Sequence, residues 1–417
     1  NLNLYEKAVE SYKEAIKLKP ENAETHYRLG LAYTSLEDNE KAIEAFQTSI
    51  KLKQDYAEAY YFIGLISYDL GQYDRAIESY KEAIRIKPEY ADAYENLISA
   101  YHKLGKDDEG IKYLQEAMKE HPDIAEPSYQ LGFYYYMNGK LKDAIDYLET
   151  ALNLYKKSSN KKYEAKALFV IGEIYLNLWK DIYAINHLQK ALDIYKEIND
   201  SEGIAGAYND IARVYFQIAD YSTALEYYKK ALEIYEKLED SPSIIRIRGG
   251  ITLVKSFIAG HSSGNYEETI KYGKQVIEFA EKTGLASDYN AFTTYMAVGM
   301  AYWKSKDYKT AIDYGNKLLE ISQQTNFKLV IVYSHILMGL ANIKLENYEE
   351  ALDYLQKASS LSNDLERASL QWICSWGFGQ LAEKSENIVD AKKHYFRAIN
   401  ILETVREDTQ SLASKMA

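Results

Sequence analysis

The sequence has few of the features that mark disulfide-rich, proline-rich or nucleic-acid-binding proteins. It contains one cysteine, Cys374, which excludes a disulfide framework and any metal site built from several cysteines. Five prolines among 417 residues exclude a collagen-like chain or a proline-rich linker. Basic residues are outnumbered, with 50 Lys and Arg against 62 Asp and Glu. The resulting net charge of −12 argues against nucleic-acid binding through a general basic face.

Long hydrophobic runs are also missing. The longest nearly uncharged stretch, residues 329–343, is shorter than a membrane-spanning helix and contains His335 and Asn342. We interpret it as a buried core helix and expect no direct membrane insertion. The chain begins at Asn1 rather than at Met, so we interpret it as a fragment. It contains no recognisable signal segment, and we expect a cytoplasmic location.

Apolar residues and tyrosine, in contrast, are plentiful. Hydrophobic residues make up 47% of the chain, which is enough for a continuous core. Tyrosine accounts for 41 residues, against 11 Phe and 4 Trp. The fold must therefore have regular places for an amphipathic aromatic side chain.

The chain repeats itself. One small residue recurs in a fixed register, at gaps of 34 residues four times and then of 40, 40, 45, 42, 40 and 40. Its eleven positions are Ala8, Ala42, Ala76, Gly110, Ala144, Ala184, Ala224, Thr269, Ala311, Ala351 and Ala391. A second small residue, usually glycine, lies twelve residues upstream, as at Gly30 and Gly64. Two small residues at facing positions predict a pair of amphipathic helices that approach closely.

A helix pair cannot bury its apolar face alone, so neighbouring pairs should stack into an α-solenoid. Pro20, Pro88 and Pro122 should end the second helices of their units, because proline lacks the N–H that a helix needs. Tyrosine rings can fill the gaps between helices while their hydroxyl groups reach the surface. The sequence therefore predicts an all-α protein of about ten complete pairs plus one partial N-terminal unit that lacks its first helix.

The 34-residue units resemble tetratricopeptide repeats (TPRs). Residues 26–33 with Ala42 and Phe46, and residues 60–64 with Ala76, carry the pattern of that family. The resemblance covers nearly the whole chain and implies a right-handed superhelix of helix-turn-helix repeats with a concave binding groove. The longer units resemble those of bacterial peptide-pheromone receptors of the Rap and NprR type, of kinesin light chains and of TPR sensor modules in signalling enzymes.

The repeat period divides the chain in two. Residues 1–156 keep a period of 34, and residues 157–417 have a period of 40 or more. We expect the six additional residues to lengthen the second helix and its loop, and the two parts to form one continuous superhelix. The unit at 244–281 is degenerate, with Thr at both small positions and a longer turn at 260–264. We expect it to be the most mobile unit of the array, with a C-terminal helix closing the chain.

Two motifs suggest chemistry, and neither has the context that this chemistry needs. Residues 260–264 match G-x-S-x-G, but a nucleophile elbow requires a preceding strand and the flanks here are helical. Residues 377–382 match G-x-G-x-x-A without a βαβ unit. The seven histidines show no metal-binding spacing, and Cys374 fits a buried core position. The sequence therefore predicts no catalytic residue, no metal site, no cofactor and no enzyme activity.

Binding residues are predicted from the resemblance. In TPRs, the groove is lined by first-helix residues three before, one after and four after the small residue. These positions give an aromatic stripe, which comprises Tyr27, Tyr61, Tyr68, Tyr129, Phe133 and Tyr136. They also give a polar centre of Asn209 and Arg213, with Lys166, Glu173 and Arg246 nearby, and an apolar stretch of Met296, Met300 and Trp303 that continues into Ile336, Leu340 and Ile343. Inter-helix packing is the alternative for all three sets.

Arg213 is the most informative of these positions. An unpaired buried guanidinium is costly, so Arg213 should be exposed in the groove or paired with Glu173 or Asp210. If it is exposed, it favours an acidic partner. The clamp that chaperone-binding TPRs use is absent, because Tyr27 and Leu31 occupy the positions of its Lys and Asn.

The sequence thus predicts a non-catalytic scaffold that binds a protein or peptide segment. The alternative is a sensory module cut from a larger signalling enzyme, for which residues 398–408 resemble a connecting helix. An enzyme in its own right is the remotest alternative. The identity of the partner and the oligomeric state stay open.

Overall fold

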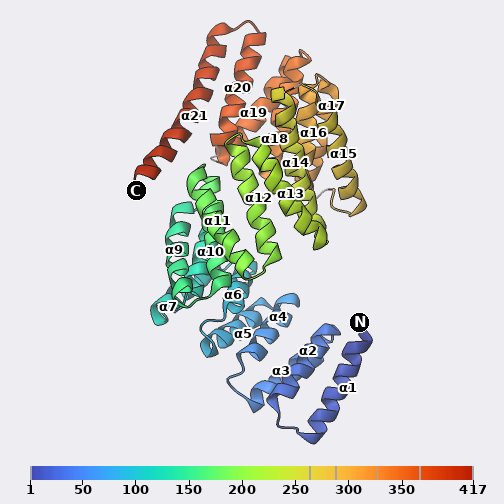
Figure 1. Ribbon diagram of the computed structural model, residues 1–417, viewed down its shortest axis with the longest axis vertical. Helices are drawn as coiled ribbons and strands as arrows, with labels where there is room; N and C mark the ends of the chain where they lie inside the picture. The colour runs from blue at the N-terminus through green and yellow to red at the C-terminus, as the bar shows by residue number, and fades with distance from the viewer. Residues whose placement is uncertain (1, 263, 287–288, 326, 366–367, 416–417) are drawn as a thin grey trace. The chain divides into compact units, whose positions relative to one another are not determined.

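The computed structural model describes residues 2–262, 264–286, 289–325, 327–365 and 368–415. These residues form 21 α-helices and no strand (Figure 1). The helices are α1 Leu2–Leu18, α2 Ala23–Ser35, α3 Asn39–Leu52, α4 Ala57–Asp69, α5 Tyr73–Ile86, α6 Ala91–Lys103, α7 Asp107–Glu120, α8 Glu126–Met137, α9 Leu141–Lys157, α10 Lys161–Asn177, α11 Asp181–Glu197, α12 Ser201–Gln217, α13 Tyr221–Lys237, α14 Ser241–Ser262, α15 Glu267–Lys282, α16 Tyr289–Lys304, α17 Tyr308–Thr325, α18 Lys328–Lys344, α19 Tyr348–Asp364, α20 Ala368–Lys384 and α21 Ile388–Lys415.

The described helices follow one another as ten adjacent pairs, from α2 with α3 to α20 with α21. Helix α1 stands before them as one further helix, in agreement with the predicted count of ten pairs plus one. Pro20, Pro88 and Pro122 each lie two residues beyond the end of a second helix, which confirms their role as helix terminators.

The small positions are where paired helices meet. A Cβ atom added at Gly30 would lie 2.6 Å from the ring of Phe46, and one added at Gly64 would lie 2.5 Å from the ring of Tyr80. The facing Ala42 and Ala76 are fully buried. Side chains at these glycines would push the two helices apart, so the spacing found in the sequence reflects a steric requirement.

The longer repeats lengthen both helices, which corrects the expectation that the second helix and its loop take all the additional residues. In a 34-residue unit, α2 has 13 residues and α3 has 14. In a 40-residue unit, α12 and α13 each have 17. The first helix gains four residues, the second gains three and the loop between units loses one. Lengthening both helices keeps their facing surfaces equal, so no apolar turn is left without a neighbour.

The insertion in the degenerate unit is also helical, where the sequence analysis expects a longer turn. Helix α14 has 22 residues and continues through Gly260, His261 and Ser262. It ends where Gly264 adopts a φ of +66° and donates its N–H to the carbonyl of Ala259 at 2.8 Å. This hydrogen bond gives a partner to a carbonyl group in the last turn of α14, which has none within the helix. Ser263 lies outside the described residues.

The chain divides into two compact units, Asn1–Ile174 and Tyr175–Ala417. The first contains two buried clusters, around Phe46 and around Tyr94. The second contains clusters around Tyr228, Tyr295 and Leu355. The boundary falls within α10, and the division at 156/157 that the repeat period suggests stays a prediction.

Candidate functional site

The predicted aromatic stripe lies in the first unit, and most of it is packed between repeats. The ring of Tyr27 lies 4.9 Å from that of Tyr56, and the ring of Tyr61 lies 4.9 Å from that of Tyr90. In both cases a first-helix tyrosine contacts the tyrosine just before the next first helix. This recurring contact accounts for part of the tyrosine excess by packing alone.

The stripe becomes more open toward α8. Tyr68 packs against Tyr73 at 5.2 Å, and Tyr129 is 8% exposed between the rings of its neighbours. Phe133 is 37% exposed and lies 6.4 Å from Tyr129 and 6.3 Å from Tyr136. Phe133 is therefore the most exposed member of the stripe.

Polar contacts cross this region of the first unit. Tyr163 donates its hydroxyl hydrogen to the carboxylate of Asp92 at 3.1 Å, which joins α10 to α6. The ammonium group of Lys166 lies 5.0 Å from the centre of the Tyr163 ring, a cation–π contact. Glu173 is half-buried on α10. Lys166 and Glu173 belong to the first unit, whereas Asn209, Arg213 and Arg246 belong to the second.

The polar centre in the second unit is built on α12 around a buried carboxylate. The side chain of Asp210 is 2% exposed and accepts hydrogen bonds from Asn209 and Arg213, each at 2.9 Å. The side chain of Arg213 remains 43% exposed. Asp210, one of the two partners considered for Arg213, is therefore confirmed, and it anchors the guanidinium. Asn209 is 8% exposed and donates to the same carboxylate oxygen as Arg213 does.

Helix α14 brings a second guanidinium to the same region. A Cβ atom at Gly250 would lie 2.8 Å from the ring of Tyr228, so this glycine lets α14 approach α13 closely. Arg246, one turn earlier on α14, is exposed and donates a hydrogen bond to Ser243 at 3.3 Å. Burial raises the pKa of Tyr228 to about 12, and the positive charges of Arg213 and Arg246 oppose this shift. Both guanidinium groups therefore lie near the Tyr228 hydroxyl.

The apolar stretch is more buried than a groove surface would be. Met296, Met300 and Trp303 on α16 are half-buried against the core of the second unit. Their expected continuation on α18 is core: Ile336 is 6% exposed and Ile343 is 1% exposed. The spacing of apolar residues on a helix does not distinguish a groove surface from an inter-helix interface. The sequence analysis therefore left both interpretations open for these residues.

A buried carboxyl group escaped the sequence analysis. Glu126 begins α8, is 4% exposed, and accepts hydrogen bonds from the backbone N–H groups of Ala125 and of its own residue. Burial raises the pKa of Glu126 from 4.5 to about 7 despite these bonds. Burial raises the pKa of the Tyr94 and Tyr155 hydroxyl groups, and the negative charge of Glu126 raises both further. The Pro at position 127 marks a helix start, but nothing local marks the burial.

The remaining motifs take structural roles where they are described. A Cβ atom at Gly379 would lie 2.5 Å from the ring of Tyr395, so this glycine is a small position between α20 and α21. Cys374 is 1% exposed, and burial raises the pKa of its thiol to about 11, as expected of a core cysteine. Of residues 260–264, those up to Ser262 lie in α14.

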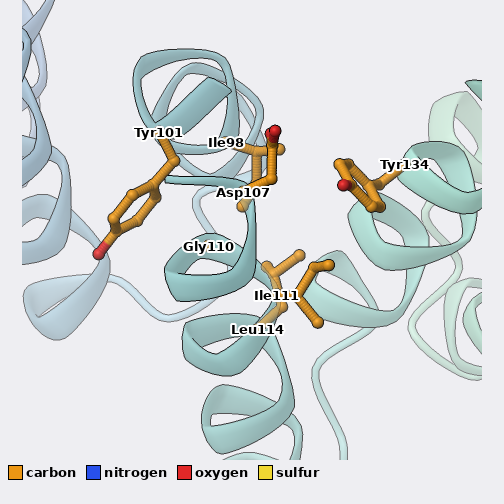
Figure 2. A pocket seen from close by; sticks show the side chains of 7 residues that line it. All are labelled: Ile98, Tyr101, Asp107, Gly110, Ile111, Leu114 and Tyr134. Carbon is orange, nitrogen blue, oxygen red and sulfur yellow. The ribbon is translucent and has the colours of Figure 1, made fainter. Parts of the chain in front are cut away.

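One depression between α6, α7 and α8 is visible, and Figure 2 shows the seven side chains around it. This unit has Ile98 where most other units have glycine, and Gly110 where most have alanine. A Cβ atom at Gly110 would lie 3.3 Å from Ile98 and 3.2 Å from Tyr101. The depression has no interior room for a water molecule, so it is a packing feature.

Among the described residues, no three His, Cys, Asp or Glu side chains are arranged so that they could hold a metal ion. Within the same part of the chain, no helix combines the length and apolarity needed to cross a membrane.

Comparison with known families gives five matching models. Those described as "Tetratricopeptide repeat" match residues 184–237, 23–56, 292–325 with 332–365, and 96–162. One described as "TPR repeat" matches residues 2–36 and 64–105. Together they cover most of the chain. No curated protein matches the sequence.

Several solved structures share the fold at low sequence identity. A Rap protein complexed with Competence and Sporulation Factor is 19% identical, with a TM-score of 0.59 over 90% of this chain and 98% of that one. The apo form of RapI is 17% identical, with a TM-score of 0.55 over 67% of this chain and 98% of that one. A STAND protein with a TPR sensor from Pyrococcus horikoshii is 16% identical, with a TM-score of 0.55 over 88% of this chain and 57% of that one.

Proposed function

The chain belongs to the tetratricopeptide repeat proteins, and on this basis we propose that it is a non-catalytic scaffold that binds an acidic peptide or protein segment. The residues that carry the binding are Arg213 and Arg246 on the first helices α12 and α14. Asp210, which also accepts a hydrogen bond from Asn209, holds Arg213 in place.

The observation behind this proposal is the charge of the polar centre. Two guanidinium groups reach the surface there, and the buried Asp210 carboxylate balances one of them. The centre thus brings two positive charges together around one buried carboxylate, in a chain of net charge −12. A fixed, partly exposed guanidinium loses little freedom when it binds a carboxylate, and the contrast with the acidic remainder steers acidic segments to it.

The structural likeness to Rap proteins supports a peptide as the class of ligand. One such protein is complexed with Competence and Sporulation Factor, and this chain shares its fold over 90% of its length. The likeness extends to the fold only. The choice of an acidic segment therefore depends on Arg213 and Arg246 and not on the relative.

Two labelled decapeptides test the proposal, one of alternating Glu and Ala and one of alternating Lys and Ala, measured by fluorescence anisotropy. We expect the Glu peptide to bind more tightly, and Arg213→Ala or Arg246→Ala to weaken its binding by about five- to tenfold. Lys229→Ala removes an exposed cation from α13 and serves as the matched control, with no effect expected.

Thermal unfolding of each variant shows whether a loss of binding reflects a loss of structure. Equal binding of the two peptides, or equal effects of Lys229→Ala and Arg213→Ala, would reject the acidic segment as ligand. A loss of stability with unchanged binding would make Arg213 a purely structural ion-pair partner of Asp210.

A second candidate is that the chain is the sensory part of a signalling enzyme. The observation that favours it is the length of α21, 28 residues against 17 in α19, which suits a helix that connects to another domain. The fold likeness to the TPR sensor of a STAND protein agrees with this. Sequencing the complete gene product for a downstream catalytic domain tests it.

A further inference from the structure

The three helix pairs from α2 to α7 share the same local geometry at two positions. The second residue of each first helix is acidic: Glu24, Glu58 and Asp92. Each second helix ends at a C-cap residue whose N–H donates to a carbonyl one turn earlier at 2.9 Å, and these residues are Lys53, Lys87 and His121. The backbone is thus alike in the three repeats, so their side chains can be compared position by position.

In the first two of these repeats, the chain itself supplies a cation to the acidic residue. The Nε atom of Arg28 lies 2.7 Å from a carboxylate oxygen of Glu24. The ammonium group of Lys87 lies 3.7 Å from a carboxylate oxygen of Glu58 and 4.9 Å from the centre of the Tyr90 ring. In the second repeat, a carboxylate and a tyrosine ring therefore hold one lysine between them.

The third repeat keeps the carboxylate but lacks the cation. His121 and Ile124 occupy the positions that Lys87 and Tyr90 have in the repeat before. A second carboxylate, Glu95, occupies the position that other repeats of this unit give to Tyr27, Tyr61 and Tyr129. Asp92 and Glu95 are both exposed, and no lysine or arginine among the described residues forms an ion pair with either of them. The first turn of α6 thus presents two unneutralised carboxylates.

Tyrosine side chains from two neighbouring helices contact this turn of α6. Tyr163 of α10 donates its hydroxyl hydrogen to Asp92 at 3.1 Å. Asn96 of α6 donates an amide hydrogen to the hydroxyl oxygen of Tyr61 on α4, also at 3.1 Å. Burial, together with the negative charges of Asp92 and Glu95, raises the pKa of Tyr61 to about 12. The two carboxylates therefore lie beside aromatic rings, as the carboxylate of the second repeat does.

We infer that the first turn of α6 binds a lysine side chain of a partner protein or peptide segment, with Asp92 and Glu95 as its ion-pair partners. The partner supplies here the cation that Lys87 supplies to Glu58. Residues three apart on a helix lie on the same face, so one ammonium group can contact both carboxylates. The site lies in the first unit, and the inference does not rest on the binding of an acidic segment by the second.

A metal ion suits this turn less well than an ammonium group does. Calcium needs six or more oxygen ligands. In the part of the chain that the structure describes, no three His, Cys, Asp or Glu side chains are arranged so that they could hold a metal. An ammonium group is satisfied by two carboxylates and a ring face.

Fluorescence anisotropy with the full chain tests the inference, using the labelled Lys and Ala decapeptide and a decapeptide of alternating Gln and Ala. We expect the Lys peptide to bind more tightly than the Gln peptide. Because exposed ion pairs contribute little, it should still bind more weakly than the Glu peptide. Asp92→Asn and Glu95→Gln should each weaken its binding by about three- to fivefold. Glu149→Gln removes an exposed carboxylate from α9 and is the matched control, with no effect expected.

His121→Lys provides a test in the opposite direction. The C-cap geometry at His121 matches that at Lys87, so a lysine side chain there would reach Asp92 as Lys87 reaches Glu58. It should compete with the Lys peptide and weaken its binding by about three- to fivefold, without lowering the midpoint of thermal unfolding. Asp123→Asn changes the net charge by the same amount at an exposed position of the same loop and should have no effect.

Four results would overturn the inference. The first is a Lys peptide that binds no better than the Gln peptide, and the second is a loss of binding in Glu149→Gln equal to that in Glu95→Gln. The third is displacement of the Lys peptide by about 1 mM Ca²⁺, which would make the carboxylates a metal site. The fourth concerns Arg213→Ala, which should leave binding of the Lys peptide unchanged whether or not it weakens that of the Glu peptide. An equal loss of Lys-peptide binding in Arg213→Ala and Glu95→Gln would place the peptide elsewhere.

Discussion

At the residue scale, Glu126 shows how a tertiary environment changes the chemistry of a common side chain. The carboxyl group starts α8, where the helix dipole and two backbone N–H groups favour the charged form. Burial opposes them and prevails, so the pKa of Glu126 rises to about 7. The folded protein therefore holds this proton more tightly than the unfolded chain does.

The consequence is a stability contribution that depends on pH. Because the folded pKa lies above the unfolded value of 4.5, the contribution is full below about pH 4.5 and is lost as the pH rises through 7. Glu126→Gln removes the charge and should raise the free energy of unfolding by about 1–3 kcal/mol at pH 8, with little change at pH 4.5. Urea unfolding of both proteins across this range measures the difference.

Glu149→Gln provides the control, since Glu149 is exposed on α9. Its unfolding free energy should follow the parent protein at each pH. If Glu126→Gln shows the same pH profile as the parent, the carboxyl group of Glu126 is not the titrating group and its burial has no energetic consequence.

At the element scale, the degenerate unit shows that a departure from the repeat pattern can be compensated by packing. Gly273 lies on α15, and a Cβ atom there would be 2.2 Å from Val298 of α16. Gly249 and Gly250 similarly adjoin Thr294 and Tyr228. These glycines thus permit close contacts with neighbouring helices, and the expectation that 244–281 is the most mobile unit stays a prediction.

Two glycine substitutions in this unit should therefore have different effects. Gly273→Ala forces Val298 aside and should lower the free energy of unfolding by about 1–3 kcal/mol, although alanine favours helix formation. Gly260→Ala, in the exposed last turn of α14, meets only the hydroxyl end of Tyr266 at 3.0 Å and should stay within about 0.5 kcal/mol of the parent. Chemical denaturation followed by tryptophan fluorescence measures both. A stabilising Gly273→Ala would mean that α15 packs loosely.

At the scale of the whole molecule, stability should be divided between the two compact units. Each repeat contacts mainly its neighbours, so a local loss of stability need not spread through the array. The sequence provides a natural probe of this, because all 4 tryptophans, at 179, 303, 372 and 376, lie in the second unit. Fluorescence reports on that unit, while far-ultraviolet circular dichroism reports on helices throughout the chain.

Gly132→Ala destabilises the first unit selectively, because its Cβ atom would lie 2.8 Å from Leu148 and 3.0 Å from the backbone nitrogen of that residue. We expect the circular dichroism transition in urea to begin earlier, and the fluorescence transition to keep its midpoint. Gly273→Ala should shift the fluorescence transition instead. If both probes shift together for Gly132→Ala, the chain unfolds as one cooperative body and the two units are not energetically separate.

The repeat architecture could be predicted from the sequence because its determinants are local or lie between immediate neighbours. Helical periodicity, the pair of small residues and the terminating prolines each act within one unit. They determined the number of helix pairs and their register. The burial of Cys374 followed from the same pattern.

The sequence could not assign the helix ends or the partners of polar groups. Helix α14 extends through the inserted residues because Gly264 closes its end on Ala259, a contact that depends on backbone geometry. Arg213 pairs with Asp210, one of the candidates that the sequence left open.

The sequence by itself therefore determined the all-helical repeat and its register. It also determined the repeat family, because the small residues at fixed positions identify it. What only the tertiary structure decided is which faces of those helices are covered: the buried Ile336 and Glu126, the half-open Arg213, and the exposed Phe133 of α8. The physical reason is that periodicity sets the direction of a side chain around its own helix, whereas burial is set by the neighbouring helices that pack over it.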